Sequence, residues 1–119
     1  GLAHIMLPSS RQSNRPEEIR KFADTAIPAM LERVVAIGGR RRLIQAKIAG
    51  GAQMFATAGD SCIANIGQRN IVAVKDCLKM LHIPIVAEDI GKNYGRTVLF
   101  YPETCLMVVR SASRGEWIW

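Results

Sequence analysis

Two apolar runs near the end of the chain, residues 96–101 and 105–110, are separated by only three residues, Pro-Glu-Thr. Parallel strands need a crossover of about a dozen residues or more, whereas a short turn joins antiparallel strands. The two runs are therefore predicted to form an antiparallel hairpin. This spacing argues against a purely parallel, doubly wound sheet. The tail that follows, with Trp117 and Trp119, is expected to form an edge strand or to fray.

Helical periodicity marks two segments in the earlier part of the chain. A helix is predicted within residues 17–37, where apolar residues recur at helical spacing, and Gly38 and Gly39 are expected to close it. Pro28 is expected to kink this helix or to delay its start. A second helix is predicted over residues 67–81.

Extended patterns lie before, between and after these helices. Strands are predicted at residues 2–8, 43–49 and 83–87. The order β-α-β-α-β-β-β predicts an α+β layered sandwich, with a mixed β-sheet and helices packed against it. The 119 residues fit a single domain, residues 1–119.

The charge balance favours an acidic partner. Lys and Arg number 16 against 10 Asp and Glu, which gives a net charge of +6. Residues 40–42 are three consecutive arginines. They are either a patch for nucleic acid or another acidic surface, or a solvated turn whose charges suit the helix end before it. Aromatic residues, which stack on bases, are not interleaved with them, so nucleic acid is the less favoured partner.

The cysteines and histidines limit the possible chemistry. Cys62, Cys77 and Cys105 are odd in number and irregular in spacing, which disfavours a disulfide framework or a metal site. Reduced thiols in the cytoplasm are therefore expected, with no metal and no cofactor. The sequence contains no run of about 18 apolar residues that predicts a membrane span. His4 lies at an apolar strand and is either structural or catalytic on these grounds.

Five ordered blocks of the chain resemble one family. They are His4-Ile5-Met6-Leu7-Pro8, Lys-Phe-Ala-Asp-Thr-Ala-Ile at 21–27, Ala-Lys-Ile-Ala-Gly-Gly-Ala-Gln-Met-Phe at 46–55, Asn-Ile-Gly-Gln-Arg-Asn at 65–70, and residues 87–91 with 94–96. Together they are similar to CheD, the chemoreceptor glutamine deamidases, from residue 1 to about residue 110. Lys92, where the family commonly has a second glycine, and Cys105-Leu106, in place of a glycine-containing turn, depart from its pattern.

The resemblance implies a Cys–His hydrolysis of glutamine side-chain amides on chemoreceptors, with His4 as the general acid–base. The family's Gly-Ser-Cys segment, which carries the nucleophile, stands before the histidine strand. Gly-Asp-Ser-Cys at residues 59–62 only echoes it and stands on the other side of His4. The chain as written is therefore expected to be N-terminally incomplete and inactive. The alternative is a non-catalytic CheD-like binding module.

The same resemblance implies the binding residues and partners. Gly50, Gly51 and Ala52 are expected to shape the substrate slot, although a plain turn also explains the glycines. Met54 and Phe55 are implied as apolar contacts for a partner, although core packing is the simpler account of Met54. The implied partners are the cytoplasmic helices of chemoreceptors and a CheC-type phosphatase, without nucleic acid or membrane insertion.

Overall fold

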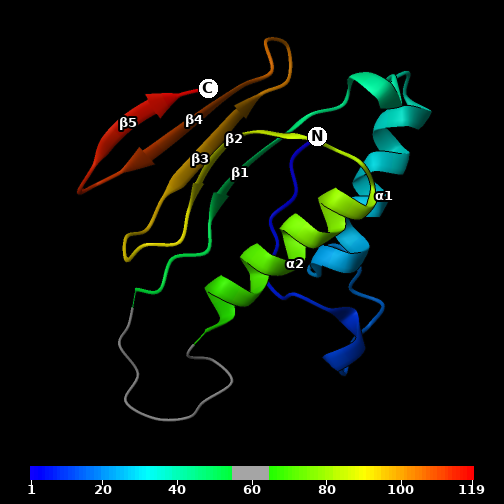
Figure 1. The fold of residues 1–119 in the computed structure, drawn as a ribbon, viewed down its shortest axis with the longest axis horizontal. Helices are drawn as coiled ribbons and strands as arrows, with labels where there is room; N and C mark the ends of the chain where they lie inside the picture. The colour runs from blue at the N-terminus through cyan, green and yellow to red at the C-terminus, as the bar shows by residue number, and fades with distance from the viewer. Residues whose placement is uncertain (55–64) are drawn as a thin grey trace.

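The structure is a computed structural model that describes residues 1–54 and 65–119 (Figure 1). Its elements, in chain order, are η1 (Ser10–Gln12), α1 (Ala23–Ala36), η2 (Arg41–Leu43), β1 (Ala46–Gly50), α2 (Ile66–Met80), β2 (Ile85–Ile90), β3 (Thr97–Tyr101), β4 (Leu106–Ser111) and β5 (Gly115–Ile118). The described helices include none with the length and apolar character that crossing a membrane requires.

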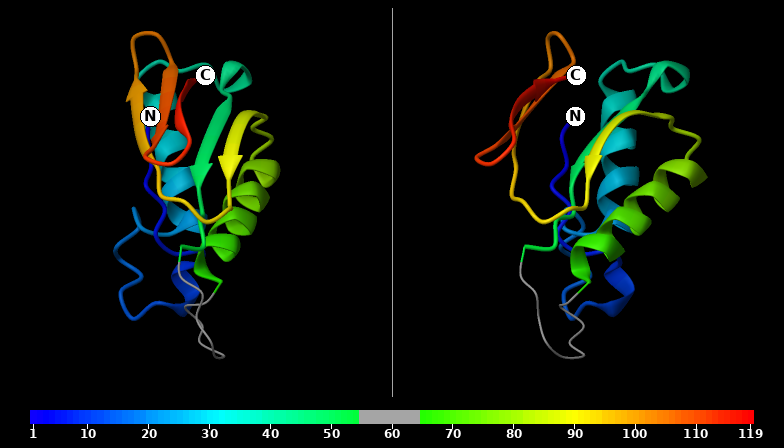
Figure 2. Two further views of the ribbon diagram at one scale, coloured as in Figure 1. Left: turned by 90° about the vertical axis from the view of Figure 1, so that its left-hand side faces the viewer. Right: turned by 60° about the vertical axis from the view of Figure 1, so that its left-hand side comes forward.

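The described strands form two sheets. β1 and β2 pair in parallel, and α2 provides the crossover between them. β3, β4 and β5 form an antiparallel sheet in that order. The predicted hairpin and the α+β class are therefore confirmed, and of the two alternatives for the tail the structure has the edge strand, β5. The parallel and antiparallel pairings occur in separate sheets among the described residues, and Figure 2 shows the two sheets as distinct layers.

The strand predicted over residues 2–8 is wrong. That segment forms one isolated parallel bridge, between Leu7 and Phe22. The N–H groups of Met6 and Leu7 both donate to the Lys21 carbonyl, at 2.9 and 3.0 Å, and the Ala23 N–H donates to the Leu7 carbonyl at 3.1 Å. Residues 2–6 would have to pair with the residues before Phe22, and these form turns in which the Lys21 N–H donates to the Glu18 carbonyl at 3.0 Å. On the other side of the bridge α1 begins at Ala23, so the ladder does not continue in either direction.

The main core lies between the two helices and the parallel pair. Its buried members are Ala23, Ile27, Leu31, Leu78 and Ile83. Helix α1 contains Pro28 but already begins at Ala23, so the proline does not delay it. Gly38 takes φ +110°, and the Gly39 N–H donates to the Val34 carbonyl at 2.8 Å, which ends α1 as predicted.

One lysine joins the two sheets. Lys47 lies on β1, and its Nζ donates to the carbonyls of Cys105 at 2.7 Å and Trp119 at 2.8 Å. These carbonyls belong to the turn before β4 and to the residue after β5. The antiparallel sheet is thus attached to the parallel pair through the side chain of Lys47.

Candidate active site

His4 lies exposed on an irregular N-terminal segment. The next residue, Ile5, packs against the buried core, which turns the His4 side chain outward to solvent. The segment is fixed by the backbone bonds to Lys21 and by Asn70 of α2, whose Nδ2 donates to the Met6 carbonyl at 3.1 Å. The imidazole is therefore accessible to a second reacting group while its backbone is held in place.

The glycine turn after β1 lies directly on the first turn of α2. Gly51 has φ +67°, and a Cβ placed on it would stand 2.5 Å from Ile71 Cγ1 and 2.9 Å from the Gly67 carbonyl oxygen. A Cβ on Gly67 would stand 2.5 Å from the Gly51 carbonyl oxygen. Both positions therefore need glycine, because a side chain would displace backbone. These glycines thus allow a close approach between two segments of this chain, the turn after β1 and the start of α2.

Consecutive residues of α2 hold the two predicted site segments. Asn70 bonds the histidine segment and Ile71 packs on Gly51. The structure thus brings the His4 segment and the glycine turn to one turn of α2. Ala52 is partly buried there.

Met54 is the last residue described before the gap. It is 55% exposed, which argues against core packing, and its Sδ would stand 3.3 Å from a Cβ on Gly95. Phe55, also predicted to contact a partner, lies outside the described residues.

The two described cysteines are poor partners for His4. Burial raises the pKa of the Cys77 thiol, and the Asp24 carboxylate raises it further, so the neutral thiol is favoured. Cys77 also packs against the core. Cys105 sits in the β3–β4 turn, where its Sγ donates to the Pro102 carbonyl at 3.7 Å. Cys62 lies outside the described residues.

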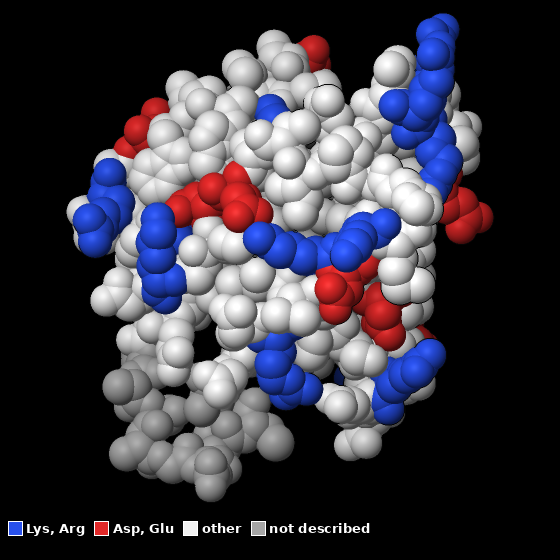
Figure 3. All heavy atoms as spheres, in the orientation of Figure 1, with Lys and Arg blue, Asp and Glu red and all other residues white. Residues whose placement is uncertain are grey.

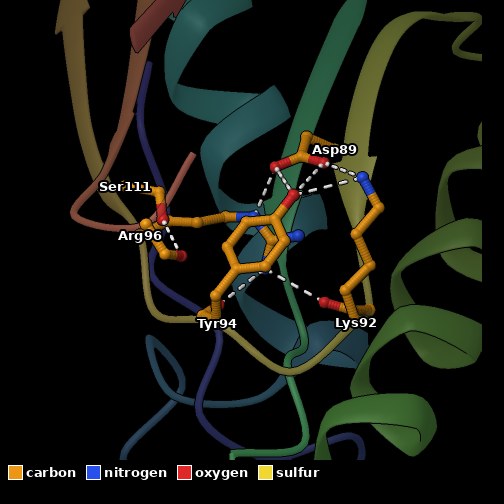
Figure 4. A network of polar contacts seen from close by, with 7 residues as sticks. Asp89, Lys92, Tyr94, Arg96 and Ser111 are labelled. Carbon is orange, nitrogen blue, oxygen red and sulfur yellow. Dashed lines mark hydrogen bonds and ion pairs between the residues drawn. The ribbon is translucent and has the colours of Figure 1, made fainter. Parts of the chain in front are cut away.

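A buried polar network stands at the turn between β2 and β3 (Figure 4). The side chains of Asp89 and Arg96 are only 7% and 2% exposed, and Arg96 Nε donates to Asp89 Oδ2. Lys92 Nζ lies 3.0 Å from Asp89 Oδ1, and the Tyr94 hydroxyl donates to the same oxygen at 3.2 Å. The hydrogen bond from Arg96 is the main reason that the pKa of Asp89 is lowered.

Arg96 also fixes the backbone of that turn. Its Nη1 donates to the carbonyls of Gly91 at 3.1 Å and Tyr94 at 3.2 Å, and its guanidinium lies 4.2 Å from the centre of the Tyr94 ring. The turn in turn meets the glycine segment, because the Gly91 N–H donates to the Gly50 carbonyl at 2.8 Å. Sequence reasoning missed this network. The available signal was the acidic Asp89 in an apolar strand, followed by Arg96.

A shallow cavity of about 350 Å³ lies elsewhere on α2, and none of the predicted site residues lines it. Pro8 and Gln12 of the N-terminal loop face Val72 and Asp76 of the helix across it. Among residues 1–54 and 65–119, no group of three or more His, Cys, Asp or Glu side chains is arranged to hold a metal ion.

Comparison with known proteins gives a consistent result. The family model described as CheD chemotactic sensory transduction matches residues 6–111. A protein named chemoreceptor glutamine deamidase CheD, from Halalkalibacterium halodurans, is 49% identical over 117 residues, which span 98% of this chain and 72% of that protein. Proteins named probable chemoreceptor glutamine deamidase CheD are 44% identical in Lachnoclostridium phytofermentans, over 98% of this chain and 72% of the relative, and 47% in Caldanaerobacter subterraneus, over 97% and 71%.

Proposed function

This chain belongs to the CheD family, and we propose that it serves in the hydrolysis of glutamine side-chain amides on chemoreceptors, with His4 as the general acid–base. The observation that carries the proposal is the exposed His4 side chain on a segment fixed by Lys21 and Asn70. An exposed imidazole can accept a proton from one reactant and donate it to another, because each of its two ring nitrogens can carry a proton.

The proposed chemistry is acyl transfer through a thioester. The imidazole accepts the proton of a cysteine thiol, and the thiolate attacks the amide carbon of glutamine. The C–N bond then breaks, and the imidazole gives its proton to the leaving nitrogen, which departs as ammonia. The same imidazole then takes a proton from water, whose oxygen attacks the thioester carbon. The C–S bond breaks, the leaving sulfur regains the proton from the imidazolium, and the product is glutamate.

The thiol in this proposal comes from the Gly-Ser-Cys segment that the family pattern places before the histidine strand. Cys77 is unsuited because its thiol is held neutral in the core. A reducing compartment keeps such a thiol free, so a cytoplasmic location suits the proposed chemistry.

Gly50, Gly51 and Ala52 form one wall of the proposed substrate slot. Their support is the contact of this turn with the same part of α2 that holds the histidine segment. Met54, half exposed beside them, and Phe55 are proposed to contact a chemoreceptor helix or a CheC-type phosphatase.

The test is ammonia release from a chemoreceptor cytoplasmic fragment. The assay uses this chain joined to the Gly-Ser-Cys segment of a relative. We expect His4→Ala to reduce the rate by about 100-fold or more, as is typical when a general acid–base is removed. Met6→Ala, at an exposed neighbouring position, is the matched control and should keep the rate. A His4→Ala variant as fast as the control would refute the role of His4.

A second candidate is a CheD-like module that binds a CheC-type phosphatase or a receptor helix without chemistry. The exposed Met54 favours it, because an unbranched apolar side chain on the surface adapts to a partner. This second candidate is supported if the chain joined to the Gly-Ser-Cys segment releases no ammonia but binds either partner, and if Met54→Ser weakens that binding.

A further inference from the structure

A corner of the molecule combines large exposed apolar side chains with arginines. We call it the basic tip: residues 37–43, which connect α1 to β1 through η2, together with Met80 at the end of α2. Ile37 is 71% exposed, Leu43 63% and Met80 81%. Among the large hydrophobic side chains of the described residues, Met80 and Ile37 are the most exposed, and Leu43 comes next together with Leu2. A turn that only faces water does not explain these three apolar side chains.

The charge of the basic tip has one sign. Arg40, Arg41 and Arg42 are all exposed, and residues 37–43 contain no acidic residue. Figure 3 shows Lys and Arg side chains gathered in a column at the upper right, the corner where α1 ends in Figure 1. An anionic surface is therefore the complementary partner.

The basic tip also has a defined shape. The Leu43 N–H donates to the Arg40 carbonyl at 2.9 Å, and the closing bonds of α1 hold Gly38 and Gly39. Arg41 Nη2 donates to the Leu81 carbonyl at 2.8 Å, which joins η2 to the end of α2. The apolar and basic side chains are thus presented together without an ordering step.

We propose that the basic tip binds the surface of a membrane containing anionic lipids. Arg40 and Arg42 pair with lipid phosphates, while Ile37, Leu43 and Met80 enter the boundary between headgroups and acyl chains. A bilayer fits better than a protein helix, because a protruding corner offers no groove in which a helix can lie. Nucleic acid does not explain the three exposed aliphatic side chains, since bases stack on aromatic ones. The protein adsorbs to this surface and does not span it.

The test is co-sedimentation with vesicles of equimolar phosphatidylglycerol and phosphatidylcholine, using the full chain. Binding should fall as salt is raised, because salt screens exposed charges. Arg40→Gln with Arg42→Gln should lower the partition coefficient about 30-fold, or about fivefold for each arginine. Arg41 is left in place because it holds η2. Ile37→Ser with Leu43→Ser should lower the coefficient about tenfold or more.

The matched control removes two exposed arginines from the opposite part of the chain, Arg11→Gln with Arg20→Gln, and should bind nearly as the unaltered protein does. An unchanged thermal midpoint shows that each variant is folded. Equal losses in the control and in the tip variant would mean a general charge effect and would overturn the proposal. The proposal would also be overturned if the unaltered protein did not sediment with the vesicles. If the tip arginines were then needed to bind a chemoreceptor fragment, the partner of the basic tip would be a protein.

Discussion

Asp89 and Arg96 are two charged residues almost completely removed from water. Their side chains are 7% and 2% exposed, and they pair across a turn of the backbone. Taking charges out of water is costly, and in a buried pair each charge compensates the other. Removing one partner therefore leaves the other as an uncompensated buried charge. The Arg96 bonds to Gly91 and Tyr94 make the same guanidinium a clamp on the turn that meets Gly50.

Asp89→Asn should lower the free energy of unfolding by about 3–5 kcal/mol, because it leaves the Arg96 charge buried without a counter-charge. Urea unfolding followed by circular dichroism measures the change. Glu116→Gln is the control, since it breaks the exposed Arg110–Glu116 pair and should change little. Equal effects of the two substitutions would show that the buried pair has no special weight.

The stability gained from Asp89 should depend on pH. Because the folded-state pKa of Asp89 is lowered, its contribution is fully present above the unfolded carboxyl pKa of about 3.9. It is lost as the pH falls through the still lower folded-state value. The difference in unfolding free energy between the unaltered protein and Asp89→Asn should therefore shrink below about pH 4. A difference that stays constant down to pH 2, far below about 3.9, would contradict this assignment.

At the scale of elements, β1 and α2 meet through bare backbone. Gly51 and Gly67 approach so closely that neither has room for a Cβ. The same turn of α2 holds the histidine segment through Asn70. The contact therefore sets the position of the proposed slot as well as the packing of helix on sheet.

Gly67→Ala should destabilise the protein by about 2–3 kcal/mol, because its Cβ would force backbone apart. Helix propensity alone predicts the opposite sign, a gain of up to about 1 kcal/mol. Thermal and urea unfolding measure the balance. Gln68→Ala, at the next and exposed position of α2, is the control and should be neutral or slightly stabilising. A Gly67→Ala variant of higher stability would show that the contact yields without cost.

Periodicity predicted the elements that stand on local patterns. Both helices, the β3–β4 hairpin and the edge strand were predicted, because apolar spacing and turn residues lie within each segment. The prediction of a strand at residues 2–8 is wrong because a strand needs an extended partner, and the residues that would pair with it, those just before Phe22, form turns. The sequence shows Asp89 in an apolar strand and Arg96 after it, but that these two residues pair could not be derived from periodicity, since the pairing depends on a turn whose shape the pair itself fixes.

At the scale of the whole molecule, the two sheets depend on one side chain for part of their connection. Lys47 Nζ donates to two carbonyls of the antiparallel part, at Cys105 and Trp119. The sequence placed Lys47 on a strand but gave no sign that its charge would serve a second sheet, because these partners are 58 and 72 residues away.

Lys47→Met should destabilise the protein by about 1–2 kcal/mol, since it keeps the aliphatic stem but removes the side-chain donor of the Cys105 carbonyl and one of the two donors of the Trp119 carbonyl, which also accepts from the Met107 N–H. The loss should be uneven. Hydrogen exchange should accelerate more at the amides of β3, β4 and β5 than in α1 and α2. Lys79→Met, at an exposed position of α2, is the control. Uniform acceleration in all elements would mean that Lys47 does not hold the sheets together.

The manner in which the first residues are attached bears on how such a protein can evolve. The segment that carries His4 is held by main-chain hydrogen bonds, by the side-chain amide of Asn70 and by Ile5, which packs against the core. The exposed imidazole of His4 is not part of that core. Mutation can therefore replace the ring without a penalty to folding. The proposed deamidase activity can thus be lost through one substitution that leaves folding intact, and selection can then act on partner binding alone.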